Sequence, residues 1–292
     1  MKGPSPLLLL IGTGTMLGLN FPIGKIAMSN GVNPALWAAM ISLGAGIAML
    51  MLAYFFNQAN ERGKVPIKYA FVSGFLSYVM PNLLTFMVIT KIGSGLAAVM
   101  FALSPVATAI LSIVMRVRPP NVWGMIGIAC GLVGALIIVF GRNANLETSS
   151  SLWIVLALLI PVFLGLGNVY RTLAWPKDAS PHFLAAYTNL AAVPFLIGIS
   201  MFNGFDLKPL LQIPALVAVQ ILVSTSMFLM FFRLQQIGGP TYLSQIGYVA
   251  AAVGLIIGVG YFGESYPLLV WVGAGVVALG VAVSTWGGMH KT

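Results

Sequence analysis

The chain has 292 residues, of which 59% belong to the hydrophobic set AVILMFWYC and only 7% are charged, and its mean hydropathy is +1.00. Soluble domains carry about 25% charged residues because their surface faces water, so this composition excludes soluble enzymes and disordered tails. The formal charge of +9 comes from 14 Lys and Arg against 5 Asp and Glu. A membrane protein collects such basic residues in its cytoplasmic loops, so we expect an integral membrane protein that binds no nucleic acid.

Ten apolar segments follow one another along the chain, separated by short connections rich in Gly, Pro, Asn and Ser. A helix rises 1.5 Å per residue, so crossing about 30 Å of hydrocarbon takes about 20 residues. The sequence therefore predicts an all-α integral membrane fold of ten transmembrane helices. The expected spans are residues 7–28, 34–56, 67–90, 94–115, 121–140, 151–172, 181–202, 210–236, 240–262 and 266–286.

Basic residues are unevenly divided between the two sides that these spans define. Ten Lys and Arg fall on the side of the N-terminus and four on the opposite side, namely Lys25, Lys91, Arg142 and Lys208. The positive-inside rule then places both termini in the cytoplasm. We expect a multi-pass protein of the bacterial inner (cytoplasmic) membrane.

Matching proline, glycine and leucine residues recur in the two halves of the chain at offsets of 145 to 147 residues. Pro34 aligns with Pro181, Gly127 with Gly273, and the run Leu17-Gly18-Leu19 with Leu164-Gly165-Leu166. This indicates a five-helix unit used twice, over residues 1–146 and 147–292. Because five is odd, the second copy enters the membrane from the opposite side, and such inverted repeats are typical of alternating-access carriers with a site near the midplane.

Three segments resemble the drug/metabolite transporter superfamily with two EamA-type repeats: residues 17–25 (LGLNFPIGK), residues 95–105 (GLAAVMFALSP) and Gly263-Glu264. The resemblance spans nearly the whole chain and is strongest to the bacterial amino-acid exporters, in particular the aromatic amino-acid branch. It implies amino acids, including aromatic ones, as substrates. Two departures stand out: residues 116–120 replace a Gly-Glu pair that the family often carries, and an arginine often found near residues 39–41 is missing.

Catalytic and metal-binding constellations are missing from the sequence. The two histidines, His182 and His290, stand at a helix start and in the terminal tail, and no His, Cys, Asp or Glu residues cluster. All five carboxylates fall in loops or at helix ends, whereas proton relays use acids within the membrane. We therefore expect no enzymatic activity, no cofactor, no metal, and no proton coupling through a buried acid.

Polar side chains are concentrated in the helices that the resemblance places around a central cavity. Such groups either hydrogen-bond neighbouring helices or line a pathway, and for Asn, Gln and Tyr both interpretations stay open. Aromatic residues such as Phe86 and Phe101 are expected to pack in the core or face lipid. The candidate substrate-binding residues are Asn20, Tyr78, Asn82, Asn168, Tyr170, Tyr187, Gln220, Ser244, Gln245 and Tyr248.

Five prolines interrupt the expected helices. Each removes a backbone hydrogen bond and kinks its helix, so the half-helices are either statically bent or able to swing as gates. The gating candidates are Pro22, Pro81, Pro105, Pro161 and Pro194. Near helix ends, Lys25, Lys91, Arg171 and Arg233 are expected to extend to lipid headgroups. Small residues at helical spacing in spans 121–140 and 266–286 predict that these two helices pack on each other.

The predicted function is a monomeric secondary transporter that exports small neutral metabolites, foremost amino acids, by alternating access. Its expected partners are this small-molecule substrate and the lipid bilayer. An exporter of drug-like lipophilic compounds is the alternative. A lipid-modifying enzyme ranks lower because catalytic clusters are missing, and a non-transporting membrane subunit ranks lower because the duplication is complete.

Overall fold

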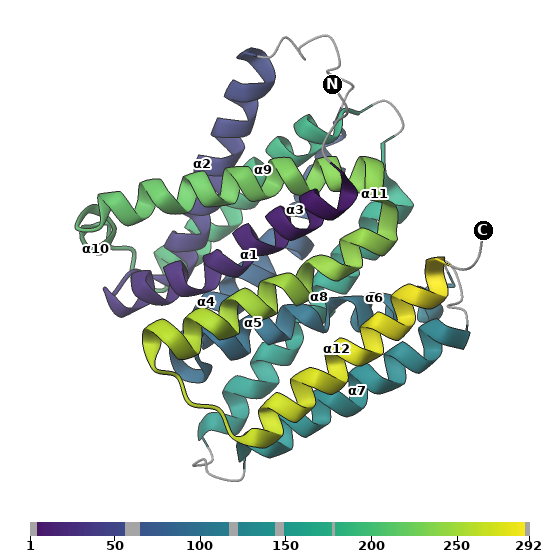
Figure 1. The fold of residues 1–292 in the computed structure, drawn as a ribbon. Coiled ribbons are helices and arrows are strands. Elements are labelled where there is room, and N and C mark those ends of the chain that lie inside the picture. The colour runs from purple at the N-terminus through teal and green to yellow at the C-terminus, as the bar shows by residue number, and fades with distance from the viewer. Residues whose placement is uncertain (1–4, 56–64, 117–121, 144–148, 177–178, 290–292) are drawn as a thin grey trace.

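The computed structural model describes residues 5–55, 65–116, 122–143, 149–176 and 179–289. Within these ranges the regular elements are all helical (Figure 1). They are α1 (Pro6–Ser29), α2 (Pro34–Phe55), α3 (Ile67–Gly74), the π-helical turn η2 (Phe75–Val79), α4 (Met80–Ile92), α5 (Ser94–Ala102), α6 (Ser104–Val114), α7 (Val122–Asn143), α8 (Ser149–Ala174), α9 (Pro181–Phe202), α10 (Lys208–Leu211), α11 (Pro214–Phe262) and α12 (Leu268–Met289).

Seven of the described helices are long and apolar enough to cross a membrane. They cover Leu7–Ser29, Pro34–Phe55, Ile67–Ile92, Ser94–Val114, Leu152–Ala174, His182–Phe202 and Pro214–Leu234. Two shorter apolar helices, Ile246–Phe262 and Leu268–Gly280, follow. The all-helical membrane fold is confirmed, and the count of ten spans stays a prediction.

Two of the predicted proline positions coincide with irregular helix geometry. The span Ile67–Ile92 contains the wider turn η2 directly before Met80 and Pro81. A proline ring crowds the carbonyl four residues earlier, and a π-helical turn gives that carbonyl more room. The span Ser94–Val114 is divided into α5 and α6, with Pro105 in the first turn of α6, where its missing N–H leaves no intrahelical bond unmade. The other three prolines lie within continuous helices.

The segment expected as spans 210–236 and 240–262 differs from the prediction. Instead of ending at the Gly238-Gly239-Pro240 sequence, the helix α11 continues through it as one element. The ribbon still changes direction there, so that the two apolar arms, Pro214–Leu234 and Ile246–Phe262, lie on either side of α1 (Figure 1). The backbone thus stays helical while its path reverses at these residues.

Glycines allow α1 to approach both arms of α11. A Cβ atom on Gly12 would lie 2.8 Å from the sulfur of Met230 in the first arm. A Cβ atom on Gly14 or Gly18 would lie 2.4 or 2.6 Å from a valine Cβ in the second arm. Glycines four residues apart are the usual means of close helix packing in a membrane. They hold α1 in the centre of the fold.

The predicted contact between the helices of residues 121–140 and 266–286 is confirmed. Helices α7 and α12 lie side by side at one edge of the molecule (Figure 1). A Cβ atom on Gly280 would lie 2.6 Å from the Cβ of Cys130 and 2.9 Å from the carbonyl oxygen of Gly127. Helices α2 and α9 pack on one another in the same way, with Gly46 against Leu190.

Two hydrophobic cores fill the space between the helices. One surrounds α5 and includes Phe21, Phe101 and Ala250. The other surrounds the fully buried Trp37 on α2 and includes Phe86 and Phe228. Side chains from both cores line the cavity described next, so the cavity lies where the two cores meet.

Candidate substrate site

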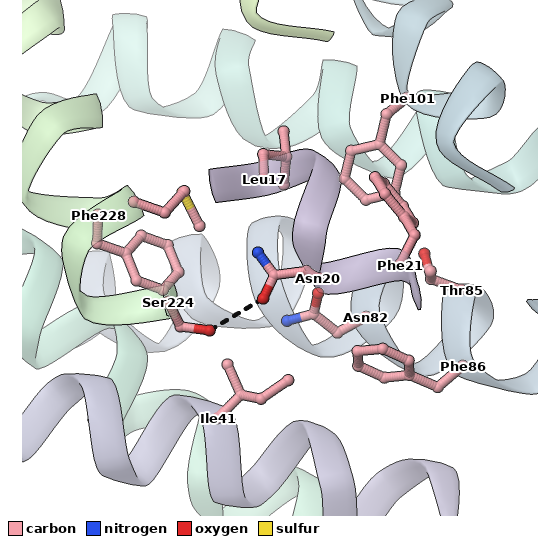
Figure 2. A pocket seen from close by; sticks show the side chains of 11 residues that line it. Leu17, Asn20, Phe21, Ile41, Asn82, Thr85, Phe86, Phe101, Ser224 and Phe228 are labelled. Atoms are coloured by element: carbon pink, nitrogen blue, oxygen red, sulfur yellow. Dashed lines mark hydrogen bonds between the residues drawn. The ribbon is translucent and has the colours of Figure 1, made fainter. Parts of the chain in front are cut away.

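A small cavity lies between α1, α2, α4, α5 and the first arm of α11 (Figure 2). Its volume is about 40 Å³. One water needs roughly 10 to 15 Å³ by the same measure, so a few waters fit and a metabolite does not. The lining residues are Leu17, Asn20, Phe21, Ile41, Asn82, Thr85, Phe86, Phe101, Ser224, Met227 and Phe228.

The polar part of the cavity joins α1 to α11. The Asn20 side-chain oxygen accepts hydrogen bonds from the Ser224 hydroxyl, at 3.1 Å, and from the Gln220 amide nitrogen. The Gln220 nitrogen also donates to the Ser224 oxygen at 2.7 Å. Among the described residues the buried Gln220 oxygen has no hydrogen-bond partner. Figure 2 shows the Asn82 amide beside Asn20, so neutral amide and hydroxyl groups gather on this side.

The remaining wall of the cavity is mainly aromatic. Phe21 and Phe101 pack edge to face, with ring centroids 5.0 Å apart. Phe86 enters the wall because residue 24 is glycine: a Cβ atom there would lie 2.4 Å from the Phe86 ring. None of the lining side chains is ionisable. The cavity therefore offers neutral hydrogen bonds beside an apolar aromatic surface, the combination that suits a small solute with both kinds of group.

A charged cluster lies where α1, the start of α5 and the connection between α11 and α12 meet. The Glu264 carboxylate, in the connection between α11 and α12, accepts a hydrogen bond from Lys25 Nζ at 2.5 Å. It also accepts from the Ser94 backbone N–H at 2.7 Å, the Ser94 hydroxyl at 2.9 Å and the Gly95 N–H at 3.1 Å. The Tyr266 hydroxyl donates to the same carboxylate. Glu264 thereby satisfies the free N–H groups of the first turn of α5 and ties α1 to α5.

The surroundings of Glu264 determine its charge. Burial alone would raise the pKa of the carboxyl, but hydrogen bonds from Lys25, Tyr266 and the Ser94 and Gly95 N–H groups outweigh it and lower the pKa to about 2. Lys25 also lies over the Phe262 ring, 4.3 Å from its centroid. The expectation that Lys25 extends to lipid headgroups is therefore wrong, because its ammonium group pairs with Glu264.

A second polar cluster surrounds Arg171 in the last turn of α8. The Arg171 side chain donates to the Asn168 side-chain oxygen at 2.6 Å, and Asn168 donates to the Thr108 hydroxyl at 3.1 Å. The Tyr78 hydroxyl also interacts with the guanidinium. Arg171 is only 8% exposed, so the expectation that it extends to headgroups is wrong. The contacts of η2 and α8 draw it inward instead.

The two clusters lie at opposite ends of the cavity. Along the span Ile67–Ile92, the cavity residues Asn82 and Phe86 stand in the middle. Tyr78, which contacts Arg171, precedes them, and Gly93, whose Cβ atom would meet the Tyr266 hydroxyl at 2.7 Å, follows them. A path through the protein would pass Arg171, the cavity and the Glu264 cluster in that order.

The structure brings some of the predicted site residues together. Asn20 and Asn82 line the cavity, Gln220 hydrogen-bonds to Asn20, and Tyr78 reaches the cavity through an edge-to-face contact with Phe228 at 5.2 Å between centroids.

Other predicted residues lie away from the cavity lining. Tyr170 stacks on Tyr69 at 5.9 Å, and Tyr187 is 42% exposed on α9. Tyr248 packs against the core around α5, and its buried hydroxyl has no described partner. The side chains of Ser244 and Gln245 lie outside the described residues.

Sequence reasoning left out three kinds of site residue. It placed Glu264 in a loop or at a helix end, expected Phe86 and Phe101 to pack in the core or face lipid, and noted Ser224 as a polar residue of its helix without ranking it with Gln220. A signal was present: Glu264 and Phe101 lie within segments that carry the family resemblance. What the sequence alone does not show is that Lys25 and Glu264, 239 positions apart, meet.

Taken together, the bundle of apolar helices and the small, mainly apolar cavity between them fit a multi-pass membrane protein. The model of the EamA-like transporter family matches residues 4–140 and again residues 151–286. The chain therefore belongs to the EamA-like transporter family and carries two EamA repeats.

Relatives agree with this assignment. The chain is 26% identical over 262 residues to the uncharacterized inner membrane transporter YedA of Escherichia coli K12, covering 87% of this chain and 82% of YedA. It is 27% identical over 143 residues to a WAT1-related protein of Arabidopsis thaliana, covering 46% of this chain and 40% of that protein. One solved crystal structure superposes with a TM-score of 0.68 at 16% identity, covering 97% and 98% of the two chains, which supports the fold.

Proposed function

We propose that this transporter exports small neutral metabolites, foremost amino acids including aromatic ones. The observation that carries the proposal is the cavity lining, where the neutral polar groups of Asn20, Asn82 and Ser224 face the rings of Phe21 and Phe101. An aromatic or large aliphatic side chain fits against such rings, and amide and hydroxyl groups hydrogen-bond an ammonium or carboxylate group. The resemblance to the aromatic amino-acid exporters points to the same substrates.

The proposed mechanism is alternating access. A cavity of about 40 Å³ cannot hold phenylalanine, so the helices around it must separate on one side at a time. The Lys25–Glu264 pair joins α1 to the connection between α11 and α12 and closes one end. Breaking the pair would open that end, and the irregular turns near Pro81 and Pro105 offer the bending points.

The carrier is proposed to work without proton coupling through a buried acid. The two described carboxylates, Asp206 and Glu264, both lie in connections between helices. Hydrogen bonds from Lys25 and its neighbours lower the pKa of Glu264 to about 2, so its carboxylate is ionised at physiological pH while these contacts are made. The remaining parts of the proposal are inverted repeats over residues 1–146 and 147–292, both termini in the cytoplasm, and a monomeric carrier.

Counterflow in proteoliposomes tests this function. Vesicles are loaded with one unlabelled amino acid, a labelled tracer of the same amino acid is added outside, and no ion gradient is imposed. Transient tracer accumulation with phenylalanine, tryptophan or leucine is expected. Faster transport under an imposed pH gradient, at a fixed substrate gradient, would contradict the absence of proton coupling.

An exporter of lipophilic drug-like compounds is the second candidate. The rings of Phe21, Phe86, Phe101 and Phe228 around the cavity favour it, because an aromatic wall accepts many apolar shapes. Counterflow that fails with every amino acid but proceeds with a lipophilic cation would select this candidate.

A further inference from the structure

Arg171 is a buried cation whose described contacts are all uncharged. Its side chain is 8% exposed, donates to Asn168 at 2.6 Å and lies 5.7 Å from the Phe231 ring centroid. Tyr69 and Tyr78 are its other close neighbours. Among the described residues the only salt bridge is the one between Lys25 and Glu264. Burying a guanidinium beside neutral groups is unfavourable unless an anion arrives to pair with it.

Comparing the two repeats shows that the cations Lys25 and Arg171 differ in whether an acidic residue stands at the corresponding position. At the offset of 147 residues that aligns Pro34 with Pro181, Lys25 aligns with Thr172, directly beside Arg171, so the two cations stand one position apart in the repeat. At the offset of 146 residues that aligns Gly127 with Gly273, Glu264 aligns with Arg118, which is a base rather than an acid. One end of the cavity therefore has a carboxylate for its cation in the sequence, and the other end has none at the corresponding position.

We propose that Arg171, together with Asn168 and Tyr78, binds the carboxylate group of the transported substrate at the end of the cavity away from Glu264. This inference rests on the proposed export of amino acids and deepens it, because it requires the carboxylate of the substrate. Arginine offers a planar fork of donors that matches a carboxylate, and the Tyr78 hydroxyl adds a further donor. The carboxylate of the substrate would supply the negative charge that the described neighbours of Arg171 do not provide.

The position of Tyr78 connects Arg171 to the cavity. The Tyr78 ring packs edge to face on Phe228, and Phe228 lines the cavity. Displacing this aromatic pair would let a carboxylate pass between the guanidinium and the amides of Asn20 and Asn82. The binding site is thus one stage of the path that the proposed function requires.

A purely structural role for Arg171 makes a different prediction. Arg171 stands in the last turn of α8, where a cation interacts favourably with the free carbonyls of a helix end. In that case its removal would lower stability without changing which ligands bind. Ligand selectivity therefore separates the two roles.

Competition against labelled phenylalanine in counterflow measures this selectivity. The competitors are 3-phenylpropionate, which has a carboxylate and no amine, and phenethylamine, which has an amine and no carboxylate. In the wild type, 3-phenylpropionate is expected to compete more strongly. In Arg171→Gln this preference is expected to fall roughly 10- to 100-fold, the loss typical of a charge-assisted hydrogen-bonded pair. Arg171→Lys should keep part of it, and Arg233→Gln, at an exposed arginine, should keep all of it.

Direct binding distinguishes failure of this inference from failure of the proposed function. Thermal stabilisation of the purified protein by the same two compounds does not require transport. Stabilisation of the wild type by 3-phenylpropionate, lost in Arg171→Gln, supports the carboxylate site even if no amino acid is transported. A folded Arg171→Gln protein with the selectivity of the wild type overturns it.

Two further experiments cover a variant that fails to fold and a lipid as the bound anion. If Arg171→Gln does not fold, Tyr78→Phe serves as the second variant, because it keeps the ring and removes only the hydroxyl donor. Carboxylate selectivity that is unchanged in both Tyr78→Phe and Arg171→Lys overturns the inference. An anionic lipid headgroup is the other source of negative charge. Carboxylate selectivity that persists in liposomes without anionic lipid supports the substrate site, whereas selectivity that depends on anionic lipid assigns Arg171 to the headgroup.

Discussion

Replacing Glu264 by glutamine tests the closed end of the cavity. The substitution keeps the size of the side chain but removes the charge that Lys25 Nζ and the Ser94 and Gly95 N–H groups share. Each tenfold change in an ionisation equilibrium corresponds to about 1.4 kcal/mol. Holding the pKa at about 2 instead of the usual 4.5 therefore corresponds to about 3 kcal/mol. Because Lys25 is 20% exposed, water screens part of this interaction, and we expect a loss of about 2 kcal/mol.

The pH dependence of this loss has a definite sign. Folding lowers the pKa of Glu264, so its contribution to stability is complete above pH 4.5, the usual value of a glutamate. The contribution falls as the pH is lowered toward about 2, where the folded protein also becomes protonated. The difference in stability between the wild type and Glu264→Gln should therefore be constant from pH 7 to pH 5 and shrink below that.

Thermal unfolding of both proteins in detergent, followed from pH 7 to pH 3, measures this difference. Asp206→Asn is the matched control, because Asp206 is exposed and its side chain accepts only from the Lys208 N–H among the described groups. We expect Asp206→Asn to change stability by less than about 1 kcal/mol. A Glu264→Gln protein as stable as the wild type at pH 7, or a difference that does not shrink at pH 3, would refute the reasoning.

Three further substitutions test the packing and the cavity. Gly18→Leu places a Cβ atom 2.6 Å from that of Val253, so the free energy of unfolding should fall by about 1 to 3 kcal/mol, seen as a lower Tm and folded yield. The control Gly260→Ala, whose Cβ atom has nothing within 4 Å, should leave the Tm unchanged. Gly93→Ala should destabilise more than Gly31→Ala in thermal unfolding, because both glycines have a positive φ but only the Cβ at 93 meets the Tyr266 hydroxyl; equal losses would contradict the contact. Asn82→Leu should lower the counterflow rate of phenylalanine several-fold with little change in Tm, since the side chain lines the cavity; a large fall in Tm with normal flux per folded molecule would instead make Asn82 a packing residue.

Hydropathy was sufficient to predict most of the helices, because each span must satisfy its own backbone hydrogen bonds and cover about 30 Å of hydrocarbon. The ends of α2 and α9 agree with the expected 34–56 and 181–202 to within one residue. The Gly238-Gly239-Pro240 sequence predicts a helix end that the structure does not show, because turn-forming residues mark where a chain can change direction and the backbone can stay helical through the bend.

The candidate site was predicted less completely than the fold. Asn20, Asn82 and Gln220 were found because amides are unfavourable in hydrocarbon and so need a partner or a pathway. The burial of Arg171 and the pairing of Lys25 with Glu264 depend on which helices become neighbours, and a single sequence does not contain that information. Long basic side chains near helix ends can reach either headgroups or the interior, and only the tertiary packing decides between these environments.

The central claim is that solute passes through the cavity between α1 and α11, and a pair of serines on α11 tests it most directly. Ser224 lines the cavity and hydrogen-bonds to Asn20, whereas Ser226, two residues further along, is exposed. Counterflow of labelled phenylalanine is measured for Ser224→Val and Ser226→Val, at equal amounts of folded protein. The account predicts a roughly tenfold slower rate for Ser224→Val, equivalent to the loss of one hydrogen bond, and a normal rate for Ser226→Val. Equal rates for the two variants would contradict it.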